Sequence, residues 1–254
     1  MHNFKLNREL AQLAIHQRIE LCSPILKRLR KIFGRYLFST FLSKYLINPN
    51  EISKKYYNLM EKELLLIEKY FVHNSKVLSI GSGIGGVEVL LNKKFNTHIS
   101  LIEKNYVSKK IKYGWDEKNQ EAYNNINLLE KFLINNGVEK KNINLFDFDK
   151  DKLPNDKFDV IISLYSLDYH YDFEIYKDYL LKVLKPDSIL ILDTVRPGYF
   201  NEIFNKIDVI KEDVDTVHKS KRIACRNLKF KWLKNLNTNL LFCYSHWYQF
   251  LSFL

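Results

Sequence analysis

The chain has little cysteine, and its three cysteines, Cys22, Cys225 and Cys243, form no Cys-x-x-Cys pair. Cys243 and His246 have the spacing of two zinc ligands, but no second ligand pair accompanies them. We therefore expect neither a disulfide framework nor a structural metal. The same scarcity favours the reducing environment of the cytoplasm.

Long uncharged runs are also missing. No segment reaches the roughly 18 consecutive apolar residues that a membrane-spanning helix requires, and the first residues mix charged and apolar side chains too closely for a signal peptide. No internal repeat or low-complexity linker is found. With 46% hydrophobic and 27% charged residues among 254, the composition predicts a globular chain that can bury a sizeable core.

Acidic residues are too few to balance the basic ones, 29 against 40, which gives a formal net charge of +11. Such a charge can indicate a polyanionic partner, either nucleic acid or anionic lipid. However, lysine far outnumbers arginine, and asparagine and isoleucine are abundant, as an A+T-rich coding sequence would produce. We favour this compositional explanation and keep the polyanionic partner as the alternative.

Glycine is scarce as well, but it is concentrated in the stretch KVLSIGSGIGGVEVLL, from Lys76 to Leu91. Strand-like residues run into the glycines, and the apolar positions then take helical spacing. Glycine permits a sharp turn at positive φ and lets a ligand approach the main chain, while the following helix directs free N–H groups at the turn. The spacing Gly-x-Gly-x-x-Gly at Gly81, Gly83 and Gly86 therefore predicts a nucleotide-like ligand. Nicotinamide, flavin and S-adenosylmethionine sites all use versions of it.

Strands and helices alternate after Lys76, which predicts an α/β fold. We expect a Rossmann-like, doubly wound, mostly parallel sheet that is closed by an antiparallel C-terminal strand pair. The expected domains are an N-terminal helical extension (1–72), a Rossmann-like domain (73–226) and an aromatic C-terminal extension (227–254). The expected strands cover 77–80, 98–102, 143–146, 158–163 and 189–192, with a final pair near 208–210 and 222–225.

Two segments outside this core carry apolar and basic residues together. In the helix expected from Pro24, the apolar face is formed by Leu26, Leu29, Phe33, Tyr36, Leu37 and Phe41, and Lys27, Arg28, Arg30, Lys31 and Arg35 lie away from it. We favour packing of this face on the core, and the alternative is contact with an anionic membrane or a nucleic-acid backbone. For the tail from Asn227, we favour packing on the core or on a second copy in a homodimer, with peripheral attachment to the inner membrane face as the alternative.

Acidic residues follow three of the predicted strands, and these residues are Glu103, Asp147 and Asp193. Glu103 ends the second strand about twenty residues beyond the glycine turn, where dinucleotide and adenosyl sites hold ribose hydroxyls. Asp147 ends the third strand. Between them, the segment 105–136 is too long for a simple crossover, so we expect a lid or a substrate wall there.

This order of parts resembles that of the class I S-adenosylmethionine-dependent methyltransferases. The matching pieces, between Lys76 and Thr194, are VLSIGSGIGG, Glu103, Asp147, FDVIISLYSLDYHY and LLKVLKPDSILIL. Within that family, SLYSLDYHY is similar to bacterial and phage proteins assigned to sugar or other small-molecule O-methylation. Two positions depart from the family pattern: Ser79 replaces a usually acidic residue that contacts the cofactor's amino group, and Asp187-Ser188 replaces Gly-Gly.

The resemblance implies S-adenosyl-L-methionine as the cofactor and assigns residues to it. Glu103 would bind the ribose diol, and Asp147 would accept from the adenine amine. The glycine turn would face the methionine and ribose portions, and the end of the fourth strand would flank the sulfonium. In the glycine turn, the residues are Gly81, Ser82, Gly83 and Gly85. At the end of the fourth strand, they are Ser163 and Leu164.

Methyl transfer is an in-line displacement, so the protein must align the reactants, exclude water and, for a hydroxyl acceptor, remove a proton. Polar and aromatic residues follow the fourth strand, at the edge where parallel sheets bind ligands. His170 is the first candidate for the base because the ordinary pKa of histidine lies near neutrality; Asp168 and Asp193 are alternatives. Tyr165, Tyr169 and Tyr171 could attract the sulfonium or stack on a sugar.

The acceptor we expect is a small molecule or saccharide, methylated at oxygen. The sequence has neither the Asn/Asp-Pro-Pro-aromatic run of enzymes that methylate exocyclic amines of bases nor the Pro-Cys nucleophile of cytosine carbon-5 enzymes. A nucleic-acid substrate is therefore disfavoured. Two alternatives stay open: an NAD-dependent oxidoreductase, since Glu103 would suit the NAD ribose equally well, and a non-catalytic binding protein with the methyltransferase fold.

Overall fold

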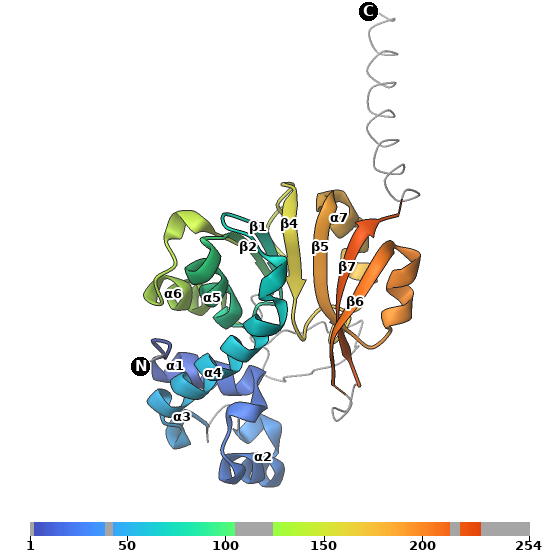
Figure 1. Cartoon of the computed structure of the whole chain (residues 1–254). Coiled ribbons are helices and arrows are strands. Elements are labelled where there is room, and N and C mark those ends of the chain that lie inside the picture. Colours follow the sequence, from blue (N-terminus) through green and yellow to red (C-terminus); the bar gives the residue numbers. More distant parts are fainter. Residues whose placement is uncertain (1–2, 39–42, 105–123, 214–218, 230–254) are drawn as a thin grey trace, which may run out of the picture.

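The computed structural model describes residues 3–38, 43–104, 124–213 and 219–229. Within them, seven strands form one sheet in the order β3-β2-β1-β4-β5-β7-β6 (Figure 1). Neighbouring strands from β3 to β5 are parallel, whereas β7 runs antiparallel to both β5 and β6. The strands are β1 (Lys76–Ile80), β2 (His98–Glu103), β3 (Ile143–Asp147), β4 (Phe158–Ser163), β5 (Leu184–Thr194), β6 (Phe204–Glu212) and β7 (Lys221–Leu228). The expected fold class is confirmed.

Apolar side chains on both faces bury the sheet between two hydrophobic layers. Along β1, Val77 packs in one cluster, and Leu78 and Ile80 pack in the other, because successive strand residues point to opposite faces. The helices α5 (Gly86–Phe95) and α6 (Ile126–Asn135) cover the first face, and α7 (Glu174–Val183) and the 3₁₀ helix η5 (Pro197–Glu202) cover the second. This is the arrangement that near-continuous apolar strands predict.

The N-terminal residues form helices at the carboxyl end of the parallel strands (Figure 1). They are α1 (Arg8–Gln17), the 3₁₀ turn η1 (Ile19–Leu21), α2 (Pro24–Leu37), α3 (Ser43–Leu46), α4 (Pro49–Ile67) and the 3₁₀ turn η3 (Glu68–Tyr70). Helix α1 starts where the side chain of Asn7 accepts a hydrogen bond from the Leu10 amide at 2.8 Å. The apolar residues of α1 and α4 share one cluster with the sheet. The division at residue 72 stays a prediction.

The first residues of β5 show how the chain compensates for a missing Gly-Gly. Helix α7 ends at Val183, and β5 already begins at Leu184, earlier than expected from the sequence. The hydroxyl of Ser188 accepts from the Lys185 amide at 2.7 Å and donates to the Phe158 carbonyl at 2.5 Å. The Ser188 side chain thus fixes the start of β5 and ties it to β4.

Several expected features fall beyond the described parts of the chain. The polar segment from Tyr113 to Glu117 and the aromatic tail from position 230 onward both lie outside them. Among the residues that the structure does describe, no helix is long and apolar enough to cross a bilayer.

Candidate functional site

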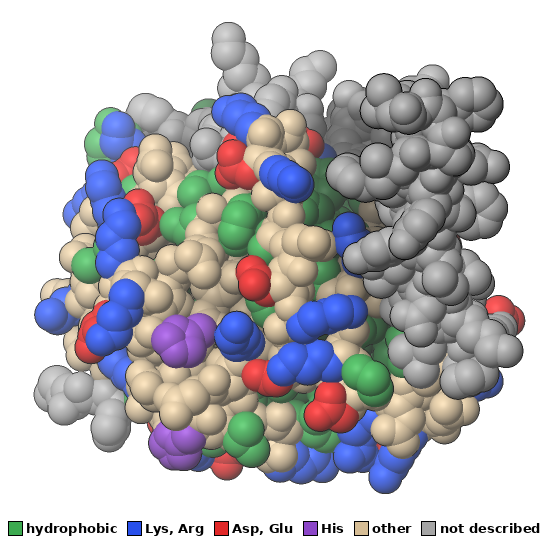
Figure 2. Space-filling model, turned by 90° about the horizontal axis from the view of Figure 1, so that it is seen from above, with side chains coloured by type: hydrophobic (Ala, Val, Ile, Leu, Met, Phe, Trp, Pro, Cys, Tyr) green, Lys and Arg blue, Asp and Glu red, His purple; other side chains and the backbone are tan. Residues whose placement is uncertain are grey.

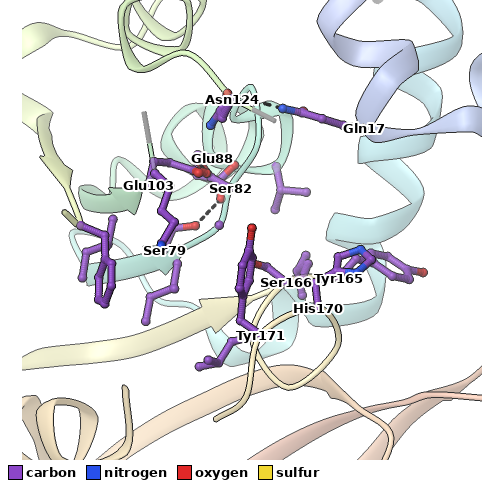
Figure 3. A pocket seen from close by; sticks show the side chains of 18 of the residues that line it. Gln17, Ser79, Ser82, Glu88, Glu103, Asn124, Tyr165, Ser166, His170 and Tyr171 are labelled. Carbon is purple, nitrogen blue, oxygen red and sulfur yellow. Dashed lines mark hydrogen bonds between the residues drawn. The ribbon is translucent and has the colours of Figure 1, made fainter. Parts of the chain in front are cut away.

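A cavity opens at the carboxyl edge of the sheet, where the glycine turn, the end of β2 and the loop after β4 meet the helices α1 and α4 (Figure 3). Of the predicted cofactor residues, Gly81, Ser82, Glu103 and Leu164 line it, and so does the predicted base His170. The cavity therefore joins the glycine turn and the loop after β4 in one space, as parallel sheets of this kind do.

The glycine turn takes backbone angles that favour glycine. Gly81, Gly83 and Gly85 have φ values of 70°, 64° and 83°, and Gly85 caps the N-terminus of α5. A Cβ on Gly81 would lie 1.9 Å from the Ser166 hydroxyl oxygen, so the turn and the loop after β4 pack too closely for any side chain there. The turn thus forms one wall of the cavity.

Glu103 holds the turn in place. Its Oε1 accepts from the Gly83 amide at 2.7 Å and from the Ser82 hydroxyl at 3.0 Å (Figure 3). Burial raises the pKa of the Glu103 carboxyl to about 7, although hydrogen bonds from Asn124, Gly83 and Ser82 oppose the rise. The Glu103 carboxylate faces the glycine turn, as its position at the end of β2 predicts.

A second buried carboxylate lies beside it. Glu88, in the first turn of α5, accepts from the Ser79 hydroxyl at 2.6 Å, and both residues line the cavity. Burial raises the pKa of Glu88 to about 7 as well, with the Ser79 hydrogen bond opposing the rise. The acidic group that β1 lacks at Ser79 is thus present at the same place, contributed by the next helix.

These two carboxylates fit the cofactor that the resemblance implies. Within the described residues, neither Glu88 nor Glu103 forms an ion pair with lysine or arginine, although the whole chain carries a net charge of +11. Buried carboxylates without a cationic partner favour a ligand that brings positive charge and hydroxyl donors. S-adenosylmethionine supplies an ammonium, a sulfonium and a ribose diol. No group of His, Cys, Asp and Glu that could hold a metal is found in the described part of the chain.

Gln17 at the end of α1 and Asn124 within the 105–136 segment close the turn from above. The Gln17 side chain accepts from the Ile84 amide at 3.2 Å and donates to Asn124 at 3.4 Å, and Asn124 in turn donates to the Gly83 carbonyl at 2.9 Å. Figure 3 shows Gln17 and Asn124 together on this side of the cavity. A helical segment far from the glycine motif in sequence therefore completes the wall.

The loop after β4 brings aromatic side chains to the cavity. Tyr171 extends into it, and His170 and Tyr165 lie on the same side (Figure 3). The His170 amide donates to the Ser166 carbonyl at 2.7 Å, which fixes the loop as a tight turn. The ring of Tyr165 is already covered by cations, with Arg18 at 4.6 Å from its centroid. The Tyr165 ring is thus poorly suited to a cationic ligand.

Three predicted site residues have other surroundings. The Asp168 carboxylate is fully buried and accepts from Thr194 and from the Arg196 guanidinium. Ser163 donates to the Ile80 carbonyl at 2.8 Å, which ties β4 to β1. Asp147 accepts from the Asp149 amide at 3.1 Å. None of the three side chains is among those that line the cavity.

Asp193 belongs to a buried charge network next to the cavity. Its carboxylate binds Arg222 through two contacts of 3.0 Å and accepts from the Tyr165 amide at 2.9 Å. Arg222 also donates to Glu63 of α4. Burial alone would raise the pKa of Glu63, but Arg222 and Arg18 hold it below its usual range. The network joins β5, β7 and α4 below the loop that carries Tyr165.

The sequence reasoning missed several cavity residues. The sequence contained a clue to Glu88. Ser79 stands where the family has an acidic residue, and an acidic residue follows in the next helix. The sequence contained a clue to Phe148 as well, since Phe148 directly follows Asp147. The contributions of α1 and α4 had no local motif to reveal them, and these residues are Gln17, Arg18, Tyr56, Met60 and Glu63.

Solved structures of low similarity share parts of the fold. One is a putative sarcosine dimethylglycine methyltransferase from Galdieria sulphuraria, with 18% identity over 58% of this chain and 49% of that one, at a TM-score of 0.38. Another is TrmN from Thermus thermophilus, which is 15% identical over 70% of this chain and 53% of its own, with a TM-score of 0.43. A third is an RNA methyltransferase from Salinibacter ruber in complex with S-adenosyl-L-homocysteine. It is 10% identical over 67% of this chain and 90% of its own, with a TM-score of 0.43.

This chain spans about half the length of the first two structures, and such distant likenesses carry no argument about its substrate. No curated protein matches it. A family model described as "Methyltransferase domain" matches residues 52–229, which is more than half of the chain. The chain therefore belongs to this methyltransferase family, which confirms its assignment to the class I S-adenosylmethionine-dependent methyltransferases, with S-adenosyl-L-methionine as the cofactor.

Proposed function

We propose that the protein transfers a methyl group from S-adenosyl-L-methionine to a hydroxyl of a small molecule or saccharide, with His170 as the base. The observation that carries the proposal is one cavity that has Glu88 and Glu103 on one side and His170 and Tyr171 on the other. When bound, the cofactor supplies a methyl group activated by positively charged sulfur. The protein must then orient the acceptor and remove its proton.

On the cofactor side, each carboxylate has a separate task. Glu103, anchored to the glycine turn, would accept from the ribose hydroxyls. Glu88 would accept from the ammonium of the methionine portion, the role that the missing acid at Ser79 leaves open. The adenine and sulfonium roles of Asp147 and Ser163 stay proposals. Phe148, which lines the cavity next to Asp147, offers an apolar surface for the adenine ring.

On the acceptor side, the loop after β4 would hold the reacting hydroxyl. His170 would take its proton, and Tyr171 would orient the acceptor or face the sulfonium. Arg18, directly after α1, and Glu63 of α4 border the same cavity. This enclosure supports a small acceptor over a base within a nucleic acid.

The first experiment separates the classes of ligand. Titration calorimetry of the full chain should show binding of S-adenosylhomocysteine and none of NAD. Binding of NAD alone would favour the oxidoreductase. Methyl-labelled S-adenosylmethionine, screened against metabolites, glycans and RNA, should then label a small molecule or a glycan. Binding without labelling of any acceptor would favour the non-catalytic alternative, and labelled RNA would contradict the proposed acceptor.

The second experiment tests the base. His170→Asn should lower kcat by about a hundredfold and remove the acidic limb of the pH profile, while the affinity for S-adenosylhomocysteine stays unchanged. The matched control is His98→Asn, because His98 is exposed at the start of β2, at the other end of the sheet. An unchanged pH profile in His170→Asn would limit His170 to positioning.

A further inference from the structure

Helix α2 combines two properties that the proposed reaction does not use. It lies at the end of the molecule beyond the carboxyl edge of the sheet (Figure 1), and its two ends connect to α1 and, through α3, to α4, the helices that border the cavity. Leu26 is buried, and Leu29 packs against the core. These two leucines fix which side of the helix faces the protein.

Several large apolar side chains of α2 are exposed, some of them on the same face as Leu26 and Leu29. Ile25 is 72% exposed and Ile32 is 63% exposed, while Phe33 and Leu37 are 48% and 43% exposed. In α3, which follows, Tyr45 and Leu46 are 62% and 50% exposed. The sequence predicted packing of the apolar face on the core. Among its described side chains, Leu26 and Leu29 pack there, whereas Phe33 and Leu37 are exposed. So many large apolar side chains on neighbouring turns mark a binding surface.

The charges of the same surface have one sign. Between Glu20 and Glu51 the sequence contains no aspartate or glutamate. Lys27, Arg28 and Lys31 are exposed on α2, and no ion pair of these three is found among the described residues. At the opposite end of the molecule, by contrast, Lys and Arg side chains are mixed with Asp and Glu (Figure 2). The positive charge of α2 therefore acts without local compensation.

We propose that α2 docks on an anionic lipid bilayer, with Ile25 and Ile32 in the acyl boundary and Arg28 and Lys31 at the phosphate groups. Ile25, Arg28 and Ile32 follow one another at i, i+3 and i+7, so apolar and cationic side chains share one face of the helix. A helix with this distribution lies in the plane of the interface. The proposal concerns binding to the bilayer and does not depend on the proposed acceptor.

A nucleic acid would explain the cations but not the apolar residues. Phosphate backbones are bound by Lys, Arg and polar side chains, and exposed isoleucines find no partner there. An acyl boundary, in contrast, removes these isoleucines from water, while the phosphate groups of anionic lipids balance the cations. The two properties together therefore favour lipid.

The test is flotation of the full chain with vesicles of phosphatidylcholine alone or mixed with phosphatidylglycerol. The chain should float with the mixed vesicles and remain at the bottom with phosphatidylcholine alone. Ile25→Ser with Ile32→Ser should weaken the partition by about ten- to a hundredfold. Arg28→Gln with Lys31→Gln should weaken it by about tenfold, and less at high salt.

Matched controls change the same side chains elsewhere. Leu65 and Val72 are 60% and 70% exposed away from α2, so Leu65→Ser with Val72→Ser should leave flotation unchanged. Lys140→Gln with Lys141→Gln removes two exposed charges near the start of β3, each paired with a glutamate, and should also leave flotation nearly unchanged. All variants should keep the melting temperature and the binding of S-adenosylhomocysteine, because the altered side chains are exposed.

Three outcomes would overturn the proposal. One is the absence of flotation with the mixed vesicles. Another is flotation that the serine variants leave unchanged, if the glutamine variants abolish both flotation and RNA binding. That result would show that α2 binds polyanions without inserting into lipid. The third is a dimer in sedimentation that the serine variants dissociate while flotation is absent, which would assign the surface to a second copy.

Discussion

The hydroxyl of Ser79, at the end of β1, donates to the buried carboxylate of Glu88, in the first turn of α5, at 2.6 Å. In the family pattern the acid lies on the strand itself. Here a serine on the strand orients an acid from the helix that follows. The exchange keeps one carboxylate at this corner of the cavity and changes the element that supplies it.

Glu88 and Glu103 should therefore respond differently to shortened ligands. We expect Glu88→Gln to weaken binding of S-adenosylhomocysteine by about tenfold or more and to leave binding of 5′-methylthioadenosine, which has no ammonium group, unchanged. Glu103→Gln should weaken binding of both, because both carry the ribose diol. Calorimetric titration measures each affinity.

The control for this comparison is Glu61→Gln, since Glu61 is exposed on α4. Equal losses for both ligands in Glu88→Gln would remove Glu88 from the ammonium site. Equal affinities of Glu103→Gln and the unmodified chain would remove Glu103 from the ribose site.

The pH dependence of stability follows from the same two carboxyls. Burial raises the pKa of both to about 7, above an ordinary value of about 4.3. The folded state consequently binds more protons than the unfolded state between these values, so the free energy of unfolding contributed by these groups falls as pH rises from about 4.5 to 7. Glu88→Gln should flatten this decline. Urea denaturation of the ligand-free chain across that range measures it, and a steeper decline in the variant would contradict the assignment.

Arg222 should be essential for stability. It is 1% exposed and lies between Asp193 and Glu63. Arg222→Met would leave two carboxylates buried without their main cation, and we expect a loss of about 3–5 kcal/mol in the free energy of unfolding. The exposed pair of Lys141 and Glu139 provides the control, because Lys141→Met should change stability by less than about 1 kcal/mol. Thermal and urea unfolding measure the stability of both variants. Similar losses of stability in Arg222→Met and Lys141→Met would contradict the role of burial.

Gly81→Ala should lower both stability and cofactor affinity. Its Cβ would lie 1.9 Å from the Ser166 hydroxyl, and its φ of 70° is strained for alanine. We expect a loss of at least about 1–2 kcal/mol from the backbone angle alone. A second change, Ser166→Gly, should restore part of the stability by removing the clash but not the strain. Gly198→Ala is the control, because no atom lies within 4 Å of the added group.

The sequence by itself determined the strands, the glycine turn and the position of Glu103. Apolar runs of strand length, such as β4, can be buried only inside a sheet, and a turn with φ near 70° at Gly81 admits few residues other than glycine. These features depend on neighbours in sequence, so local patterns reveal them. The parallel order of the strands then placed the end of β2 next to the turn.

Only the tertiary structure decided which side chains face the cavity. Asp168 and His170 are two residues apart in one tight turn, yet Asp168 is buried against Thr194 and Arg196, whereas His170 lines the cavity. Gln17 reaches the Ile84 amide from 67 positions away, and Glu88 reaches Ser79 across a strand-to-helix turn. Contacts of this kind depend on how the helices pack on the sheet, which no local pattern in the chain encodes.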